Sequence, residues 1–433
     1  MGLSEAAGIP ARVVALAALS AVLRRRRPLD AALDEALGNT GLPARDAAFA
    51  HAIASETLRR FGQLDALLKA FMAKPPAPHR AGAAPEILLM GACELLFLGV
   101  PPHAAVDAAN RLAARDSKAA HFKALINAVL RRLAKEGREV IAAQDAARLN
   151  TPDWLWDRWC EAYGEVAVRA IADVHAMTPP LDIVCKPGLA PGFGDAVALP
   201  GNVFRLTHAG RVDALPGFAD GSWWVQDFAA ALPARLLGEV TGKTVIDLCA
   251  APGGKTAQLA AAGAHVIAVE RMPERVVHLR GNLSRLGLSA EIVEADMRDF
   301  TPKELAARVL LDAPCSATGT IRRHPELPRI KDLSDVNLCA DAAAELLDRA
   351  AQMVAPGGLL VFAVCSLEPE EGVEQVDAFL ARHPEYSRLP IAAKDIFGIG
   401  ELISPEGDLR TLPCHLGAQG GMDGFYAARL RRV

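Results

Sequence analysis

Two cysteines stand where chemistry is favoured over simple packing. Cys315 follows the apolar segment 308–314 and Cys365 follows the apolar segment 358–364, and both segments are typical of buried parallel strands. Neighbouring strands lie about 5 Å apart in a sheet, so we expect the two thiols to face the same pocket. Because a thiolate is a strong nucleophile, the pair predicts covalent catalysis. A single buried cysteine would instead indicate core packing.

A loop rich in glycine predicts where a cofactor binds. The strand 245–249 is followed by a turn at Pro252, Gly253 and Gly254, and then by helix-favouring residues from Thr256 to Ala262. Glycines let backbone N–H groups approach a ligand closely, and the helix directs its positive end to the same place. The loop residues expected to contact the cofactor are Cys249, Ala250, Ala251, Pro252, Gly253, Gly254 and Lys255.

Carboxylates end three of the other predicted strands, where the ligands of open α/β sheets bind. Glu270 stands 23 residues after Asp247, near the spacing at which an acidic side chain accepts hydrogen bonds from a ribose. Asp296 is expected to bind an adenine amine. Asp312 stands three residues before Cys315 and so belongs to the same predicted site.

The loop alone leaves the cofactor open, because NAD and S-adenosylmethionine bind to the same architecture. The turn reads A-P-G-G rather than G-x-G-x-x-G, which argues against NAD, and no nicotinamide-handling half follows it. The thiols favour S-adenosylmethionine, because carbon 5 of cytosine attacks a sulfonium methyl group only after a thiolate has added to carbon 6. One cysteine would attack and the other assist release, while Asp312 would handle the proton at ring nitrogen 3.

The elements that must position these residues form a doubly wound, Rossmann-type α/β domain. Near-continuous apolar strands at 245–249, 265–270, 291–296, 308–314 and 358–364 alternate with helices, which indicates a parallel sheet covered on both faces. Residue 227, an aspartate, is expected to cap the helix that opens this domain.

The segments before this domain are of two kinds. Residues 10–137 read as helix almost throughout, with breaks at Gly38, at 74–76 and at 99–102, and predict an all-α domain. The stretch 181–225 carries short apolar runs among prolines and glycines and predicts a small β connector. We therefore expect a helical domain at 1–140, a connector at 141–225 and a catalytic domain at 226–433.

Composition sets further bounds. A chain of 433 residues, 51% apolar, predicts more than one core. The eight cysteines occur singly, without C-x-x-C spacing, so neither a metal site nor a disulfide framework is expected, and a reducing cytoplasm fits best. Arginines interrupt the apolar residues near the start, and no uncharged apolar run of about 18 residues occurs, so no membrane segment is expected. We expect a monomer.

Several motifs resemble a known family. DLCAAPGGKT, DAPCSATGTIRRHPE, AVCSLEPEEG and DGFYAARL are similar to motifs of the RNA 5-methylcytosine methyltransferases of the NOL1/NOP2/Sun family, and the resemblance covers nearly the whole chain. Segments 48–68 and 121–135 resemble the NusB-like RNA-binding fold, which points to the bacterial RsmB-type branch. The resemblance implies that Cys365 is the nucleophile, that Cys315 promotes product release, and that the substrate is a cytosine in small-subunit (16S) ribosomal RNA. It places cofactor contacts at the glycine loop and at Glu270, Asp296 and Asp312.

Basic residues predict where RNA binds. Residues 1–150 carry an excess of Lys and Arg, whereas the remainder is acidic. A solvated helical surface is the alternative explanation for the basic part. The residues expected at phosphates are Arg322, Arg323, Arg329 and Lys331, which lie just beyond the predicted strand 308–314, and Arg131 and Arg132 in the NusB-like part. The chain departs from the family where a tryptophan usually follows Glu326 and in a connector that looks shortened, and both departures concern recognition of the target nucleotide.

Two other functions fit the same sequence. The first is methylation of cytosine in another RNA, such as tRNA. The second is a catalytically silent RNA-binding assembly or antitermination factor that keeps the fold for binding. Retention of both Cys315 and Cys365 speaks against the second, since binding requires neither thiol.

Overall fold

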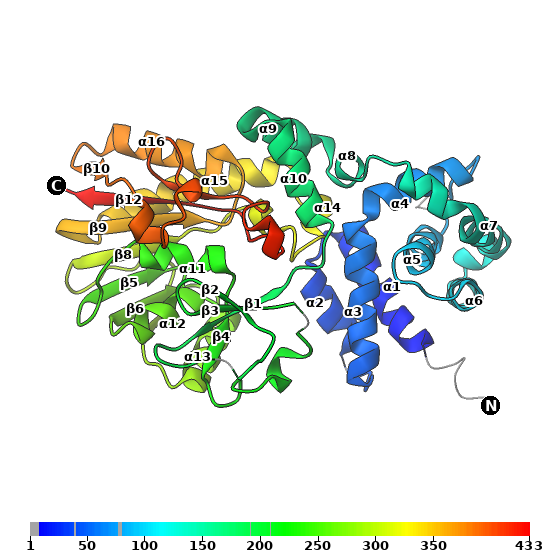
Figure 1. Cartoon of the computed structure of the whole chain (residues 1–433), viewed down its shortest axis with the longest axis horizontal. Coiled ribbons are helices and arrows are strands. Elements are labelled where there is room, and N and C mark those ends of the chain that lie inside the picture. The colour runs from blue at the N-terminus through cyan, green and yellow to red at the C-terminus, as the bar shows by residue number, and fades with distance from the viewer. Residues whose placement is uncertain (1–7, 39, 77–79, 191, 208) are drawn as a thin grey trace. The chain divides into compact units, whose positions relative to one another are not determined.

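The computed structural model describes residues 8–38, 40–76, 80–190, 192–207 and 209–433, and the chain divides into two compact units (Figure 1). The first, here called the helical unit, runs up to Ala176 and also includes Arg323–Asp332. The second, here called the sheet unit, comprises Met177–Arg322 and Leu333–Val433. Residues 323–332 begin inside the Cys315 motif DAPCSATGTIRRHPE (312–326), yet they belong to the helical unit.

The helical unit confirms the expected all-α fold. Its first part contains the helices α1 (Ile9–Arg25), α2 (Leu29–Leu37), α3 (Ala44–Arg59), α4 (Phe61–Phe71), α5 (Ala84–Leu96), α6 (Pro102–Ala113), η1 (Ala119–Phe122), α7 (Lys123–Ala142), α8 (Ala146–Asn150), α9 (Asp153–Tyr163) and α10 (Glu165–His175). Helix α5 is buried along nearly its whole length and forms the centre of the core. Inside this core Arg12 pairs with Glu94, so that neither charge is buried alone.

Residues 323–332 add a short helix, α14 (Leu327–Ile330), to the helical unit. The backbone N–H of Leu29 donates to Glu326 at 3.2 Å, and Arg26 donates to the carbonyl of Ile330 at 2.8 Å. The segment is therefore held by the ends of α1 and α2.

The sheet unit is built around a large mixed sheet. Its strands are β5 (Thr244–Leu248), β6 (His265–Glu270), β7 (Glu291–Glu294), β8 (Ala306–Asp312), β9 (Val354–Val364), β10 (Tyr386–Arg388), β11 (Leu409–Thr411) and β12 (Phe425–Arg432), in the order β10-β12-β9-β8-β5-β6-β7 with β11 beside β12. The pairs β7-β6, β6-β5, β5-β8 and β8-β9 are parallel, which confirms the doubly wound core.

The expectation of a wholly parallel sheet was wrong at one edge. Strand β12 is antiparallel to β9, β10 and β11. The apolar pattern predicted β9 but not β10, β11 or β12. Alternation of strands and helices predicts parallel strands. Strand β12 follows a long irregular segment and runs antiparallel to its neighbours, so this alternation does not predict it. Arginines at 429, 431 and 432 also interrupt its apolar pattern.

Both faces of the large sheet are covered by helices (Figure 1). The helices of this unit are α11 (Phe228–Arg235), α12 (Gly254–Ala261), α13 (Pro273–Leu286), α15 (Leu333–Ala351) and α16 (Val373–Arg382), with short 3-10 turns η2 (Val212–Ala214), η3 (Thr318–Thr320), η4 (Pro369–Glu371), η5 (Ala393–Ile396), η6 (Gly400–Leu402) and η7 (Gly417–Gln419). Along β5, Val245 packs with α11 to α13 and Ile246 packs with α15, as the alternation of a strand requires. The carboxyl ends of the parallel strands thus meet at one edge.

The predicted small β connector is a four-stranded antiparallel sheet of β1 (Leu181–Cys185), β2 (Val197–Leu199), β3 (Val203–Leu206) and β4 (Trp223–Val225), in the order β2-β3-β1-β4. Asp182 on β1 pairs with the buried Arg205 at 2.7 Å and accepts a hydrogen bond from the backbone of Phe228 at 3.1 Å. These contacts fix the small sheet to α11. Asp227 caps α11 by accepting from the backbone of Ala229 at 2.9 Å, as expected.

Candidate active site

The ends of β8 and β9 bring Cys315 and Cys365 together. The two strands pair in parallel register with Asp312 opposite Ala363. Three residues beyond Asp312 and two beyond Ala363, the two Sγ atoms lie 3.3 Å apart. The expectation that the strand ends would bring the two thiols together is confirmed.

The surroundings of the two thiols are not equivalent. The hydrogen bond with Cys365, together with burial and the nearby charge of Glu371, raises the pKa of Cys315 well above that of an ordinary thiol. Cys315 therefore keeps its proton at neutral pH. Either sulfur can donate in this contact, and Cys315 can donate its S–H to Cys365 when Cys365 is a thiolate.

The loops that carry the cysteines are joined by their backbones. Gly319 donates from its N–H to the carbonyl of Cys365 at 3.0 Å and accepts from the N–H of Gly424 at 2.7 Å. A Cβ at position 319 would lie 1.9 Å from the carbonyl oxygen of Gly424, so only glycine fits there. The Cys315 loop is thereby held between the end of β9 and the start of β12.

A buried polar cluster that the sequence did not predict lies behind the cysteines. Ser316 and Ser366, the residues that directly follow the two cysteines, both hydrogen bond to Glu371. Glu371 belongs to the motif AVCSLEPEEG, where the sequence assigns it no role. A carboxylate soon after a Cys-Ser pair could have been noted, but its partner Ser316 lies 55 residues away in sequence.

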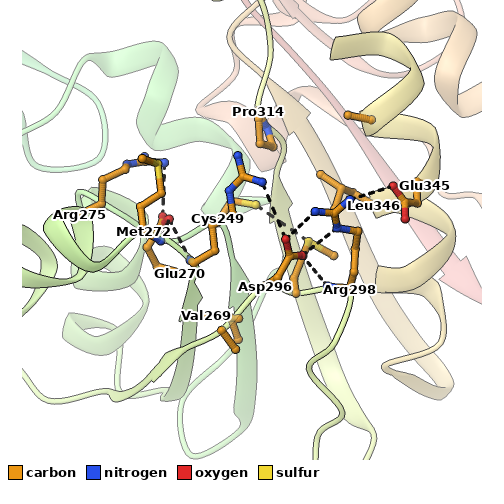
Figure 2. A pocket seen from close by; sticks show the side chains of 14 residues that line it. Cys249, Val269, Glu270, Met272, Arg275, Asp296, Arg298, Pro314, Glu345 and Leu346 are labelled. Carbon is orange, nitrogen blue, oxygen red and sulfur yellow. Dashed lines mark hydrogen bonds and ion pairs between the residues drawn. The ribbon is translucent and has the colours of Figure 1, made fainter. Parts of the chain in front are cut away.

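A cavity of about 180 Å³ lies at the same edge of the sheet (Figure 2). Cys249, Glu270 and Asp296, all predicted cofactor residues, line it. The other lining residues are Val269, Arg271, Met272, Arg275, Ala295, Met297, Arg298, Pro314, Ala342, Glu345 and Leu346. Pro314 directly precedes Cys315, so the cavity and the thiol pair are adjacent along the chain.

The glycine loop turns sharply between β5 and α12. Gly253 has φ +103°, and a Cβ there would lie 2.5 Å from the side chain of Leu279, so the residue must be glycine. Gly254 begins α12, which confirms the predicted order of strand, turn and helix. The remaining loop residues, Ala250, Ala251, Pro252 and Lys255, belong to this turn and to the first turn of α12.

Glu270 and Asp296 play different electrostatic parts. Buried Glu270 accepts hydrogen bonds from the backbone of Arg271, Met272 and Ala251 at 3.0, 3.1 and 3.3 Å, and so ties the glycine loop to the end of β6. Asp296 pairs with Arg298 at 2.6 Å, which lowers the pKa of this carboxyl to about 2. Burial raises the pKa of Cys249 to about 12, so this thiol lines the cavity without being reactive.

Lys255 connects the glycine loop to the catalytic strand end. Its Nζ donates to Asp312 at 2.7 Å and lies 5.0 Å from the ring centroid of Phe425. The lysine is almost fully buried, while about a third of the Asp312 side chain is exposed. The ammonium of Lys255 and the carboxylate of Asp312 are therefore hydrogen bonded at the end of β8.

Two predicted RNA contacts have other partners in the structure. Arg322 is 1% exposed, donates to Asp423 at 2.9 Å and pairs with Asp227, so its guanidinium is a buried structural cation. Arg329 lies over the ring of Phe61 at 4.7 Å, and burial lowers its pKa to about 10. The burial of Arg322 contradicts its expected place at an exposed RNA surface, because its partners 227 and 423 lie too far away in sequence for the pairing to be predicted. Contact of the half-buried Arg329 with RNA stays a prediction.

The other predicted RNA residues have accessible side chains. Arg323, Arg131 and Arg132 are exposed, and Lys331 is half-buried. Arg131 donates to Asn127 at 3.2 Å, and Arg132 pairs with Glu136 at 2.9 Å and lies over the Phe71 ring at 4.6 Å. Surface pairs of this kind are weak, so a phosphate could replace them.

The described residues contain neither a metal-binding cluster nor a membrane-spanning helix. No group of three or more His, Cys, Asp or Glu side chains among them is placed to hold a metal ion. Within the same ranges no helix is both long and apolar enough to cross a membrane.

A doubly wound sheet with a cavity and a thiol pair at its carboxyl edge, preceded by a helical unit, defines a Rossmann-type methyltransferase with an accessory helical domain. The family of 16S rRNA methyltransferase RsmB/F matches residues 234–431, and the NusB family matches residues 9–135. The chain is also 35% identical to ribosomal RNA small subunit methyltransferase B of Pseudomonas putida, over 98% of both chains. This chain therefore belongs to the RsmB/F family of rRNA methyltransferases, and the family resemblance found in the sequence is confirmed.

Other proteins are similar to this chain in sequence or in fold. Ribosomal RNA small subunit methyltransferase B of Cronobacter sakazakii is 34% identical, over 89% of this chain and 90% of the relative. The crystal structure of PH0851 has the same fold over 99% of both chains, with a TM-score of 0.77 at 22% identity. A methyltransferase homolog protein from Pyrococcus horikoshii covers 64% of this chain and 94% of its own, with a TM-score of 0.53 at 26% identity.

Proposed function

We propose that this chain methylates carbon 5 of a cytosine in 16S ribosomal RNA, with S-adenosylmethionine as methyl donor and a covalent bond between Cys365 and carbon 6 as intermediate. The observation that carries the proposal is the 3.3 Å contact between two thiols beside the cavity of a methyltransferase fold. A methyltransferase whose target is already nucleophilic requires no thiol, whereas methylation at carbon 5 of a pyrimidine requires one.

The cavity lining fits the proposed methyl donor. Glu270 accepts from three backbone N–H groups and pairs with Arg275 at 3.4 Å. A ribose hydroxyl would take the position now faced by the partly exposed Arg275. Met297 and Leu346 supply an apolar surface for a flat base, and Asp296 supplies acceptors beside them. The helix that begins at Gly254 favours a negative group such as the donor's carboxylate. When bound, the donor would supply an electrophilic methyl group on a sulfonium.

The two cysteines divide the covalent steps. The thiolate of Cys365 forms the S–C6 bond, and the electron pair of the ring double bond moves so that carbon 5 becomes nucleophilic. After carbon 5 has gained the methyl group, a base removes its proton, the S–C6 bond breaks and the double bond returns. Cys315 keeps its proton beside Cys365, and its S–H can stabilise the departing thiolate of Cys365 by donating a hydrogen bond to it.

Lys255 and Asp312 serve the base during addition. Negative charge develops on the ring when the thiolate adds, and it is relieved by a proton or hydrogen bond at ring nitrogen 3. Asp312 is the partly exposed carboxyl nearest in sequence to Cys315, and Lys255 donates a hydrogen bond to it at 2.7 Å. A proton that passes from this ion pair to ring nitrogen 3 neutralises the charge on the ring and leaves neutral Lys255 beside the Asp312 carboxylate.

The RNA is expected to contact basic groups on the helical unit, with Arg131 and Arg132 as candidates for phosphate contacts. The target base would have to leave its stack to reach the thiols. All eight cysteines are free, and a reducing compartment such as the cytoplasm would keep the reactive pair reduced.

Incubation of the purified chain with labelled S-adenosylmethionine and unmethylated 16S rRNA, followed by nucleoside chromatography, tests the proposal. We expect label in 5-methylcytidine from 16S rRNA. Label in tRNA instead would favour the other-RNA alternative. Tight RNA binding without any label would favour a silent binding factor, and either result would overturn the proposed function.

A further inference from the structure

A single buried carboxylate joins the two loops that carry the cysteines. Glu371 lies in η4 with no exposed surface. One of its oxygens accepts from the backbone N–H of Ser316 at 2.7 Å, and the other accepts from the Ser316 hydroxyl at 2.5 Å and from the Ser366 hydroxyl. Ser316 is bonded to Cys315 in the chain and Ser366 to Cys365, so the carboxylate lies one residue away from each thiol.

The same cluster also fixes the backbone beyond Cys365. The Ser366 hydroxyl accepts from the N–H of Glu368 at 3.0 Å and lies 3.2 Å from the hydroxyl of Thr318. The Thr318 hydroxyl in turn accepts from the N–H of Leu367 at 3.0 Å. Each loop therefore contacts the other through hydroxyl groups, and Glu371 receives hydrogen bonds from both loops.

The hydrogen bonds to the buried carboxylate restrict the positions of the two loops. A carboxylate removed from water is costly unless hydrogen bonds compensate it, and here two serines supply them. Any displacement of one loop would leave part of the carboxylate without a partner. The favoured geometry is thus the one in which both serines, and with them both cysteines, occupy their present positions.

We propose that Glu371 is a positioning residue that holds Cys315 and Cys365 at thiol contact. The consequence for catalysis rests on the function proposed above. The charge of Glu371 also contributes to the raised pKa of Cys315, in keeping with a thiol that keeps its S–H and donates a hydrogen bond. A displacement of about 1 Å between reacting groups can cost about 100-fold in rate. The alternative is that Glu371 stabilises the fold without affecting the sulfurs.

A trivalent arsenical measures the thiol geometry without any need for methylation. Phenylarsine oxide forms two As–S bonds with a close pair of thiols, and its oxygen leaves as water with both thiol protons. When both thiols bind at once, the second bond forms intramolecularly, and this avidity is worth roughly 10²-fold or more. Full-length protein with both cysteines should therefore retain the arsenical, and Cys315→Ala should lose it.

Glu371→Gln is the decisive variant, because the amide keeps the shape but presents a donor where the carboxylate accepts. We expect about 100-fold weaker arsenical retention and about 100-fold lower kcat, with the cofactor KM little changed. Asp408→Asn is the matched control. It alters another fully buried carboxylate of the same unit, which accepts from Tyr426 at 2.5 Å. We expect it to lower the melting temperature without affecting arsenical retention.

Ser316→Ala serves if Glu371→Gln does not fold, since it removes one hydroxyl and keeps the backbone N–H bond. It should weaken arsenical retention and lower kcat by about 10-fold each, against about 100-fold for Glu371→Gln. Normal arsenical retention in a folded Glu371→Gln or Ser316→Ala protein would overturn the positioning role, whatever the RNA assays show. Loss of retention together with an absence of methylation in the unaltered chain would contradict the proposed function but leave the geometry of the cysteine pair established.

Discussion

Lys255 and Asp312 join two loops of the sheet edge through one 2.7 Å hydrogen bond. Lys255 belongs to the first turn of α12, and Asp312 is the last residue of β8, three residues before Cys315. Phe425 lies beneath the ammonium at 5.0 Å and limits where the lysine can move. The loop proposed to hold the methyl donor is therefore bonded directly to the strand that leads to the thiols.

Asp312→Asn should separate chemistry from binding. The amide cannot exchange a proton with Lys255, so we expect kcat to fall by about 10²-fold while RNA affinity changes little. Asp296→Asn provides the contrast, because Asp296 lines the cavity away from the thiol pair and should mainly weaken binding of the methyl donor. Single-turnover methylation rates and equilibrium binding of S-adenosylmethionine would measure both effects. Equal losses of kcat in the two variants would contradict the assigned division of roles.

Arg322 should contribute to stability rather than to RNA binding. Arg322→Ala leaves Asp227 and Asp423 as buried carboxylates that have lost this cation, and we expect a loss of about 3–5 kcal/mol in the free energy of unfolding. Arg323→Ala, at the exposed neighbouring position, should change stability by less than about 0.5 kcal/mol. Urea denaturation of both variants provides the measurement. Similar stabilities would contradict the structural role of the buried arginine.

The helical unit should make salt-dependent RNA contacts. Replacement of Arg131 and Arg132 by alanine should weaken RNA binding and lower the slope of log affinity against log salt by about 1 to 2. Lys69→Ala is a suitable control, because it removes an exposed cation of α4 that pairs with Asp65. Filter binding across a salt series would show the difference. An unchanged slope in the double variant would exclude both arginines as phosphate contacts.

Asp247 should make stability depend on pH. Burial raises its pKa from 3.8 to about 7 in the folded chain, and Thr256 donates to it at 2.6 Å. Because the folded pKa is the higher one, the folded state binds the proton more tightly. The resulting stabilisation is fully present below about pH 4 and is lost as pH rises through about 7.

Asp247→Asn removes this titration while it keeps a neutral acceptor for Thr256. The free energy of unfolding of the variant, relative to that of the parent, should therefore rise between pH 4 and pH 7. Chemical denaturation at several pH values in this interval would measure the difference. A constant difference across the interval would show that Asp247 does not change its protonation there.

The sequence predicted what depends on local pattern. Apolar runs located the parallel strands, and the positions at their ends placed Cys315, Cys365, Glu270 and Asp296 at one edge. Residues whose role depends on distant partners were beyond such reasoning. Arg322 pairs with carboxylates 95 and 101 residues away, so in sequence it was indistinguishable from an exposed basic residue.

The role of Glu371 also depends on partners that are distant in sequence. Glu371 belongs to a motif that resembles the family, but its hydrogen bonds depend on the turn of η4 and on a serine in another loop. The sequence alone therefore could not predict them. Strand β12 overlaps the motif DGFYAARL, but the sequence did not predict it as a strand. Its pairing with β9 joins segments about 60 residues apart.

Identification of the residue that bonds to RNA would test the central claim most directly. In Cys315→Ala protein, release of Cys365 from carbon 6 should be impaired, so a covalent protein–RNA complex should accumulate with 16S rRNA and S-adenosylmethionine. After nuclease and protease digestion, mass spectrometry should find a methylated cytidine attached to the peptide that contains Cys365, and Cys365→Ala should yield no complex. A nucleotide on any other residue, or a stable complex in the Cys365→Ala protein, would contradict the account.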